Sequence, residues 1–312
     1  MAHALAGPVA ESPPQTACRR FSRAAWGVLA YNILVVLWGA FVRATGSGAG
    51  CGDHWPLCNG TLVPRAPHVE TLIEFTHRVT SGMALAGVAG LTIWAFTLFP
   101  RGHHARRFAA LSMLFLVTEA LLGAGLVLLR YVAHNASAGR AAYLSAHLVN
   151  TQILLAMLAT TAWFGADPFR KWRAAPKMVV AALPVALLVA VSGAIAALGD
   201  TLYPAVSLAS GMRQEFSSAA SALERLRVLH PAVAVVAGIF LLAAAIPATR
   251  TAQPAAARAG WLAAALVVVQ LAAGAVNIAL LAPVWMQILH LLIADLLWIA
   301  LVVMTLEIGR AD

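Results

Sequence analysis

Four histidines lie inside long apolar segments of the chain, each a few residues after its segment begins: His77, His147, His230 and His290. Polar and metal-binding side chains are costly within a bilayer, so four of them at matching places need an explanation. Neutral imidazole binds iron well, and haem sites in helix bundles are formed by inward side chains on facing helices. The pairs His77 with His147 and His230 with His290 therefore predict two haem sites. The alternative is four unrelated histidines satisfied by backbone or water.

A carboxylate stands beside only one of these pairs. Glu74 precedes His77 by three residues, so both side chains project from one face of a helix. In the second half of the chain, Arg227 stands three residues before His230. A carboxylate next to a haem-binding histidine can transfer protons or stabilise a cationic intermediate. The asymmetry suggests chemistry in the first half and a fixed redox cofactor in the second, unless Glu74 merely pairs with Arg78 one turn further.

Several arginines gather near the outer ends of the apolar segments. Haem has two propionates, and the guanidinium group suits bidentate carboxylate binding. Candidates for these contacts are Arg43, Arg78, Arg130 and Arg227. The alternative for each is contact with lipid headgroups through a snorkelling side chain.

Two of the three cysteines lie close together in a glycine-rich loop. A loop of this kind can bring Cys51 and Cys58 into disulfide distance, and the outer face of a bacterial-type membrane permits such bonds. A disulfide is therefore favoured, and it can be structural or redox-active. A zinc site would need further ligands, which His54 and His68 can supply, but the spacing matches no standard pattern. Cys18 is expected to be a free thiol.

Eight apolar segments of about 20 residues or more, the length that spans a bilayer, must position these residues. The segments are 24–43, 71–98, 108–130, 140–164, 178–198, 223–247, 259–282 and 286–307. A chain of 312 residues that is 61% hydrophobic and 11% charged cannot cover a soluble surface. Backbone in lipid must satisfy its own hydrogen bonds, so we predict an all-α integral membrane protein with eight transmembrane helices. The net charge of +9 falls between the segments, which argues for a lipid bilayer and against nucleic acid as partner.

The basic residues also predict the orientation. Most of them lie in the first tail and in alternate loops, which places both termini in the cytoplasm. Residues 1–23 lack the pattern of a cleaved signal, so we expect a cytoplasmic tail there. All four histidines then lie within the first two turns of helices that enter from outside. We expect a multi-pass protein of the cell membrane with its haem sites near the extracytoplasmic face.

The two halves of the chain resemble each other in the same order of motifs. TEALLGAGLVLL (118–129) matches VQLAAGAVNIAL (269–280), and AHLVNTQILLAML (146–158) matches LHLLIADLLWIAL (289–301). These matches place Glu119 on Gln270 and Gln152 on Asp295. We therefore predict two pseudo-symmetric four-helix bundles, 24–164, where we expect the chemistry, and 178–307, where we expect the fixed redox cofactor. A cytoplasmic linker, 165–177, joins them, and a short tail, 308–312, ends the chain.

The chain resembles the haem A synthase family over nearly all of residues 20–307. The most specific parts are GCGDHWPLCNG (50–60), IEFTHRVTSG (73–82), the later histidines and the repeat of four helices. The resemblance implies an oxidoreductase that oxidises a methyl group of haem O, by successive steps, to the formyl group of haem A for terminal oxidases. One departure is that loop 199–222 lacks the second cysteine pair that some members carry.

The resemblance also implies a role for each residue. His77 and His147 would bind the substrate haem O, and His230 and His290 a haem b cofactor. Glu74 would be the catalytic residue, and Cys51 and Cys58 would form the loop disulfide. Implied partners are haem O synthase, terminal oxidase assembly factors, and a quinone or thiol-redox protein for electrons.

Two other functions fit parts of the pattern. A dihaem cytochrome in quinol-linked electron transfer would share the histidine pairs but would not need Glu74. A repeat-built transporter would use polar groups in the membrane, and Glu119 would then be a proton site. A hydrogen bond from Glu119 to a neighbouring helix is the interpretation we favour. Small residues along several segments also permit homo-oligomer packing.

Overall fold

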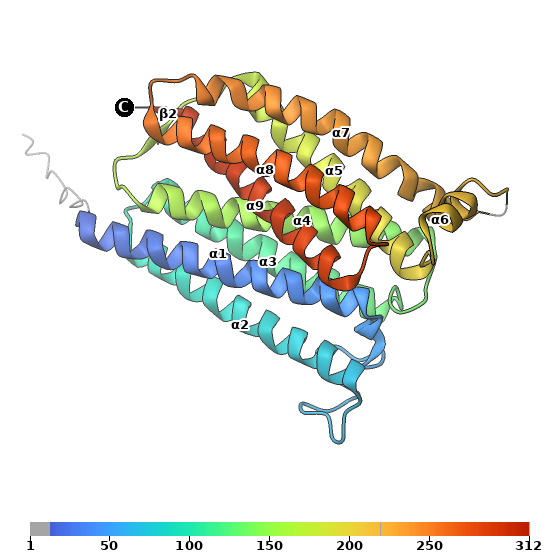
Figure 1. The fold of residues 1–312 in the computed structure, drawn as a ribbon. Coiled ribbons are helices and arrows are strands. Elements are labelled where there is room, and N and C mark those ends of the chain that lie inside the picture. Colours follow the sequence, from blue (N-terminus) through green and yellow to red (C-terminus); the bar gives the residue numbers. More distant parts are fainter. Residues whose placement is uncertain (1–12, 219, 312) are drawn as a thin grey trace, which may run out of the picture.

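The computed structural model describes residues 13–218 and 220–311, and eight long helices dominate it (Figure 1). They are α1 (Gln15–Ala44), α2 (Val69–Leu98), α3 (His104–Leu128), α4 (Ala138–Gly165), α5 (Lys177–Leu202), α7 (Ala222–Thr249), α8 (Pro254–Ala279) and α9 (Val284–Ile308). Each is long and apolar enough to cross a membrane. Large apolar side chains such as Leu34, Ile93 and Trp261 face outward, as lipid contact requires. The structure thus confirms the predicted all-helical, multi-pass class.

The first four long helices pack in a closed ring. Helix α1 packs on α2 and α4, and α3 fills the space between α2 and α4 on the other side. Helices α2 and α4 therefore face each other diagonally. In the second set, α5 packs on α7, α7 on α8, and α8 on α9, while α9 also contacts α5. Helices α7 and α9 are accordingly the diagonal pair of that set, and the histidines lie on the two diagonal pairs.

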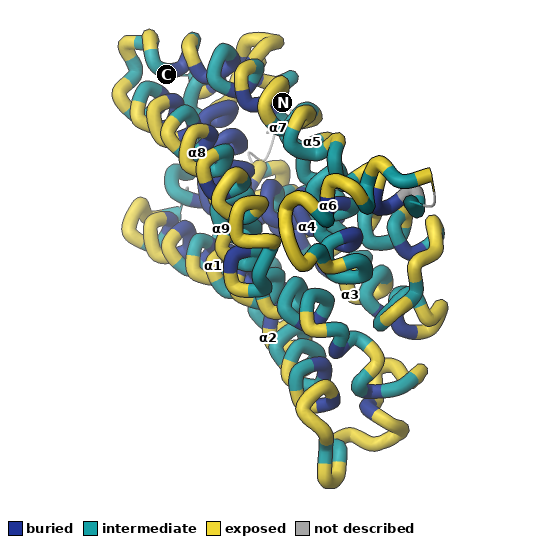
Figure 2. Tube along the Cα trace, turned by 45° about the vertical axis from the view of Figure 1, so that its right-hand side comes forward, coloured by how far each residue is buried: buried dark blue, intermediate teal, exposed yellow. Residues whose placement is uncertain are grey.

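The two sets meet through α4 and α9, which are the most buried of the long helices (Figure 2). At the centre of this contact, Nε2 of Gln152 donates to Oδ1 of Asp295 at 2.8 Å, and both side chains are buried. Nε1 of Trp298 donates to the backbone oxygen of Gln152 at 2.7 Å. Gln152 and Asp295, which the sequence repeat aligns with each other, are thus in contact at the centre of the molecule.

Both ends of the described chain lie at one end of the helix array, and the longer loops lie at the other (Figure 1). The longer loops contain the 3-10 turn η1 (Ser47–Ala49) and the short helix α6 (Leu208–Glu215). At the end with the termini, strand β1 (Lys171–Trp172) in the linker pairs antiparallel with β2 (Arg310–Ala311). This small sheet ties the connection between the two sets of helices to the end of α9.

Several helix boundaries differ from the sequence prediction, and two of them change the predicted tail and an outer loop. Helix α1 begins at Gln15 rather than at residue 24, so part of the expected tail 1–23 is helical. Arginines at 19, 20 and 23 interrupt the apolar run, but their long side chains can reach the headgroups while the backbone stays helical. Helix α5 likewise continues to Leu202, and loop 199–222 contains α6, because backbone hydrogen bonding does not stop where the apolar composition ends.

Candidate functional site

Each of the four predicted histidines packs against a glycine on a neighbouring helix. The pairs are His77 with Gly39, His147 with Gly123, His230 with Gly193, and His290 with Gly274. A Cβ at Gly39 would lie 2.9 Å from Cε1 of His77, and one at Gly193 would lie 3.0 Å from Cε1 of His230. Any side chain at these two glycines would therefore displace the ring. The absence of a Cβ is what allows an imidazole to project between tightly packed helices.

The histidines are grouped two by two. His77 on α2 lies within electrostatic range of His147 on α4, and His290 on α9 lies within range of His230 on α7. Since α2 and α4 are diagonal, these two histidines lie on helices that face each other across the first ring of helices, and the second set repeats this arrangement. All four helices begin at the end of the molecule that carries the disulfide loop and α6 (Figure 1). The two pairs therefore lie towards the same end.

The imidazole nitrogens fit the demands of a haem iron. Nδ1 of His77, His147 and His290 is buried without a hydrogen-bond partner of good geometry among the described residues. In His230, Nδ1 lies 2.9 Å from the hydroxyl of Ser192, which leaves Nε2 for another partner. A ligating histidine typically binds metal through one nitrogen and a protein group through the other. Two such rings suffice for one haem, because the porphyrin supplies the equatorial ligands.

Glu74 is buried, with 3% of its surface exposed, directly beneath the loop that carries the disulfide. Its Oε2 accepts a hydrogen bond from the backbone N–H of Cys51 at 2.8 Å. Its Oε1 forms an ion pair with Arg78, one turn further along α2. The pairing of Glu74 with Arg78 is thus present, and it accompanies a contact with the loop that the sequence did not suggest.

The loop itself is held down on the start of α2. A disulfide joins Cys51 to Cys58, so these sulfurs are not free to bind zinc with His54 and His68. The hydroxyl of Thr71 donates to the backbone oxygen of Gly50 at 2.7 Å, and a Cβ at Gly50 would collide with the backbone of Glu70. Arg78 donates to the backbone oxygens of His54 and Leu57, both at 2.6 Å. Arg78 therefore connects the loop to Glu74.

The other three arginines expected near propionates have protein partners. Arg43 on α1 crosses to the second set of helices, where it donates to the backbone oxygen of Ala197 at 2.8 Å and to Oε1 of Gln287 at 3.0 Å. Arg130 forms an ion pair with Asp53 at 2.6 Å, and both side chains are more than half exposed. Long flexible side chains take whichever partners the folded neighbours present, so position at a helix end did not identify these contacts.

Arg227, the fourth of these arginines, already pairs with two carboxylates. Its Nε donates to Glu215 at 2.6 Å and its Nη1 to Asp200 at 3.2 Å, which fixes α6 against α7 and α5. Its Nη2 is buried and has no hydrogen-bond partner within the part of the chain that the structure describes. One guanidinium edge is thus uncommitted in the second set of helices.

Comparison with known proteins decides the family. A family model described as cytochrome oxidase assembly protein, COX15-CtaA, matches residues 22–302. The chain belongs to the COX15-CtaA family. The matched range contains the four histidines, Glu74 and both loop cysteines.

Two kinds of relative are similar to this COX15-CtaA protein. Two proteins from different strains of Thermus thermophilus are named protoheme IX farnesyltransferase and are each 49% identical over 288 residues. That match covers 91% of this chain but 47% of each relative, so the chain spans about half the length of these proteins. Proteins named heme A synthase match over shorter stretches. The Exiguobacterium protein is 42% identical over 96 residues, covering 31% of this chain and 32% of the relative. A Bacillus cereus protein is 46% identical over 95 residues, covering 30% of each.

Sequence reasoning left the role of Glu119 open, and the structure places it at the first histidine pair. Oε2 of Glu119 on α3 accepts a hydrogen bond from Nδ2 of Asn150 on α4 at 2.6 Å, and Oε1 accepts one from the hydroxyl of Thr151. The expected bond to a neighbouring helix is thus confirmed. Oε1 also lies 3.2 Å from Nδ1 of His147. One signal in the sequence could have predicted this contact. Asn150 and Thr151 follow His147 by three and four residues, so they share its helix face.

Sequence reasoning also missed two neighbours of the second histidine pair. One is Ser192, which contacts His230 as described above. The other is Gln270, whose Nε2 lies 3.2 Å from Nε2 of His290. The repeat alignment had matched Gln270 with Glu119, and this match was the signal that both positions face a histidine.

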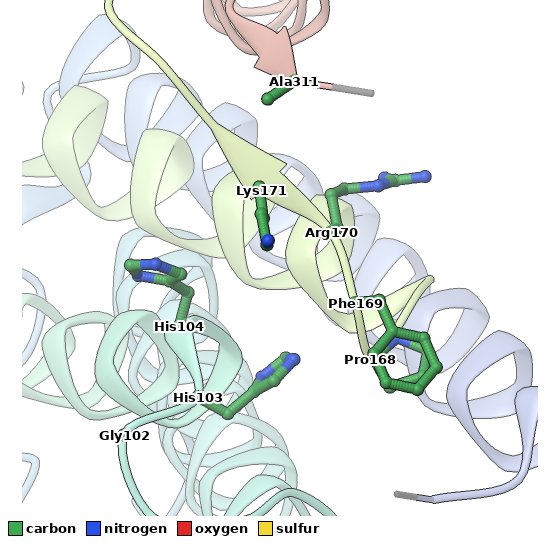
Figure 3. Close-up of a pocket in the computed structure, with 8 residues that line it drawn as sticks. All are labelled: Gly102, His103, His104, Pro168, Phe169, Arg170, Lys171 and Ala311. Carbon is green, nitrogen blue, oxygen red and sulfur yellow. The ribbon is translucent and has the colours of Figure 1, made fainter.

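A hollow of about 500 Å³ lies at the opposite end of the molecule, beside the termini (Figure 3). It is lined by Gly102, His103, His104, Pro168, Phe169, Arg170, Lys171 and Ala311. Burial lowers the pKa of His103, which favours the neutral ring, and its Nδ1 accepts a hydrogen bond from the N–H of Ala105 at 3.1 Å. None of the predicted site residues lines this hollow, so it is separate from the histidine pairs.

Proposed function

We propose that this protein is a haem A synthase, an oxidoreductase that converts a methyl group of haem O into the formyl group of haem A. The observation that carries the proposal is Glu74, buried beside His77 and bonded to the disulfide loop, in only one of two histidine-bearing sets of helices. Membership of the COX15-CtaA family and the heme A synthase relatives support it.

The first set of helices binds the substrate in this proposal. His77 and His147 hold the iron of haem O, which brings the oxidising chemistry when it is bound. Glu74 lies one turn from His77 on the same face of α2, where it could accept a proton that the methyl or alcohol group releases as its electrons pass to the electron-transfer partner. Arg78 and the N–H of Cys51 hold the two carboxylate oxygens in one orientation. Their role is to fix the base relative to the porphyrin rim.

The second set holds a resident haem b and transfers electrons. His230 and His290 are its ligands, and Ser192 orients the ring of His230 through Nδ1. The place that Glu74 takes in the first set is taken here by Arg227, whose free Nη2 suits a propionate. A cation at that place cannot serve as a proton acceptor, so this set is assigned to the cofactor.

The two sets of helices form pseudo-symmetric bundles with both termini in the cytoplasm. The motif repeat and the shared pairing of histidine with glycine support the symmetry. The basic residues near the termini support the orientation, because positive charge is retained on the cytoplasmic side. The haem sites then lie near the extracytoplasmic face of the cell membrane.

The supplier of haem O is the partner that the relatives best support. The Thermus thermophilus relatives bear the name of a farnesyltransferase acting on protohaem, and this chain matches less than half of their length. An enzyme that makes farnesylated haem is therefore expected to work next to this protein. The family description supports delivery of the product to cytochrome oxidase assembly. The electron partner is a quinone or a thiol-redox protein.

Extraction of the bound pigments tests the proposal. The full chain is produced in cells that supply haem O, and the purified protein is extracted and its haems separated. The proposal predicts haem A in the extract together with haem b. An extract that contains haem b and unconverted haem O indicates a dihaem cytochrome instead, and a colourless protein indicates a transporter; either result contradicts the proposal.

A further inference from the structure

We propose that Glu119 is a positioning residue that acts through His147 and lowers the reduction potential of the haem bound there. The inference rests on the proposed function, because it takes His147 as an iron ligand. It concerns the ring nitrogen that iron does not use. When one imidazole nitrogen binds metal, a carboxylate at the other fixes the ring and raises its basicity. A more basic ligand stabilises ferric over ferrous iron.

The geometry places the carboxylate at that nitrogen. Oε1 of Glu119 lies 3.2 Å from Nδ1 of His147. The orientation of the ring does not give this contact the geometry of a hydrogen bond. Nε2 of the same ring lies towards Gly123, 3.9 Å from where a Cβ on that glycine would be. The ring therefore has a carboxylate near Nδ1, which leaves Nε2 as the nitrogen that would bind iron.

Glu119 is fixed by the helix that carries its histidine. Asn150 and Thr151, the residues one turn beyond His147 on α4, donate to the two carboxylate oxygens. Asn150 is itself held by the hydroxyl of Thr118, which donates to its Oδ1 at 2.6 Å, and by the backbone oxygen of Phe115. The carboxylate thus has one orientation, and in that orientation it reaches His147.

The surroundings of Glu119 differ from those of Glu74. A carboxylate in a membrane span is costly unless a positive group compensates it. Within the part of the chain that the structure describes, no arginine or lysine forms an ion pair with Glu119, whereas Glu74 has Arg78. The iron–porphyrin core of a ferric haem carries a formal positive charge, and His147 would connect that charge to Glu119.

The second set of helices lacks the whole arrangement. Gln270 stands where Glu119 stands, and its uncharged amide lies 3.2 Å from Nε2 of His290, the opposite ring nitrogen from the one that Glu119 approaches in His147. The positions that match Asn150 and Thr151 are Ile293 and Ala294, so the donors are lost together with the carboxylate. The repeat therefore places a carboxylate beside a histidine in the first set only. This difference predicts that the first haem has the lower reduction potential.

A potentiometric titration of the purified, haem-loaded protein tests this inference. Glu119→Gln gives the first set of helices the amide that the second set has at this position. Gln270→Glu gives the second set the carboxylate of the first. For Glu119→Gln we expect the ferric-to-ferrous ratio of the first haem to fall about tenfold at a given potential, a rise of about 59 mV for a one-electron couple. The second haem should not change. Gln270→Glu should lower the potential of the second haem alone, and Glu70→Gln, at an exposed site on α2, should change neither.

The controls separate this inference from the proposed function. His147→Ala should remove one haem spectrum, and retention of both haems would refute the ligand assignment itself. If His147→Ala loses one haem but Glu119→Gln leaves both potentials unchanged, the inference about Glu119 is overturned and the proposed function is not. If Glu119→Gln does not retain haem, Glu119→Asp is titrated in its place, because its shorter side chain withdraws the carboxylate from Nδ1 of His147. An unchanged potential of the first haem in Glu119→Asp then overturns the inference.

Discussion

At the scale of single residues, the environment of each histidine separates the two sites. His77 has a buried glutamate one turn away, and His147 has a second carboxylate at Nδ1. His230 and His290 have a serine and a glutamine as neighbours instead. Imidazole is the same ligand in each case, so differences in chemistry between the sites must come from these surrounding groups.

The glycines behind the histidines give a prediction at this scale. Gly39→Ala puts a methyl group 2.9 Å from the ring of His77, and overpacking of this kind costs about 1–3 kcal/mol. The first haem should therefore bind about tenfold more weakly or worse, with the second haem retained. Gly27→Ala is the matched control. Gly27 lies on the same helix as Gly39, and a Cβ there would meet nothing within 4 Å. Haem content per protein measures the effect, and full occupancy in Gly39→Ala would contradict the packing argument.

At the scale of elements, the disulfide loop acts on α2 through its backbone. The N–H of Cys51 bonds Glu74, and the hydroxyl of Thr71 bonds Gly50, so the loop is fixed at the start of the helix. The sulfurs themselves hold the loop closed but do not touch the carboxylate in these contacts. The disulfide thus supports the position of Glu74 from a distance.

This arrangement predicts a partial effect when the disulfide is removed. The double variant Cys51→Ser, Cys58→Ser keeps the backbone N–H but loosens the loop. Haem A formation should fall between about tenfold and 100-fold, because a misplacement of about 1 Å can cost up to 100-fold. Both haem spectra should persist. A different result would indicate that the sulfurs take part in electron transfer. In that case haem A is lost completely, while hydrogen exchange shows that the loop remains ordered.

Some elements were predictable from the sequence and others were not. The apolar runs located all eight long helices, and the spacing of Glu74 and His77 placed both on one face of α2. The partners of Arg43 and the contact between Glu119 and His147 were not predictable, because they depend on which helix faces meet. Helical periodicity fixes a face relative to its own axis and gives no information about the neighbour that covers it.

At the scale of the whole molecule, polar contacts join the two sets of helices along their length. Arg43 crosses to Ala197 and Gln287 near the disulfide-loop end. The pair Gln152–Asp295 lies at the centre, and Nε1 of Trp163 donates to Glu307 at 2.8 Å near the end with the termini. Hydrogen bonds are directional, so these contacts set the register of one histidine pair relative to the other.

The central pair gives a prediction at this scale. Asp295→Leu leaves the buried amide of Gln152 without its acceptor and should reduce the free energy of unfolding by about 1–3 kcal/mol. Asp295→Asn keeps an acceptor of the same size and should stay close to the wild type. Unfolding of the purified protein in detergent, followed through its haem absorption, measures both variants. Equal stability of Asp295→Leu and the wild type would show that the pair does not hold the two sets together.

The central claim is that Glu74 takes part in the oxidation while the histidines bind haem. Its most direct test is pigment extraction from Glu74→Gln, produced with a source of haem O beside the wild type and the exposed control Glu70→Gln. The account predicts that Glu74→Gln retains haem b and haem O but forms at least about 100-fold less haem A, the range of a lost acid–base group. Glu70→Gln should match the wild type. Haem A at the wild-type level in Glu74→Gln would contradict the account.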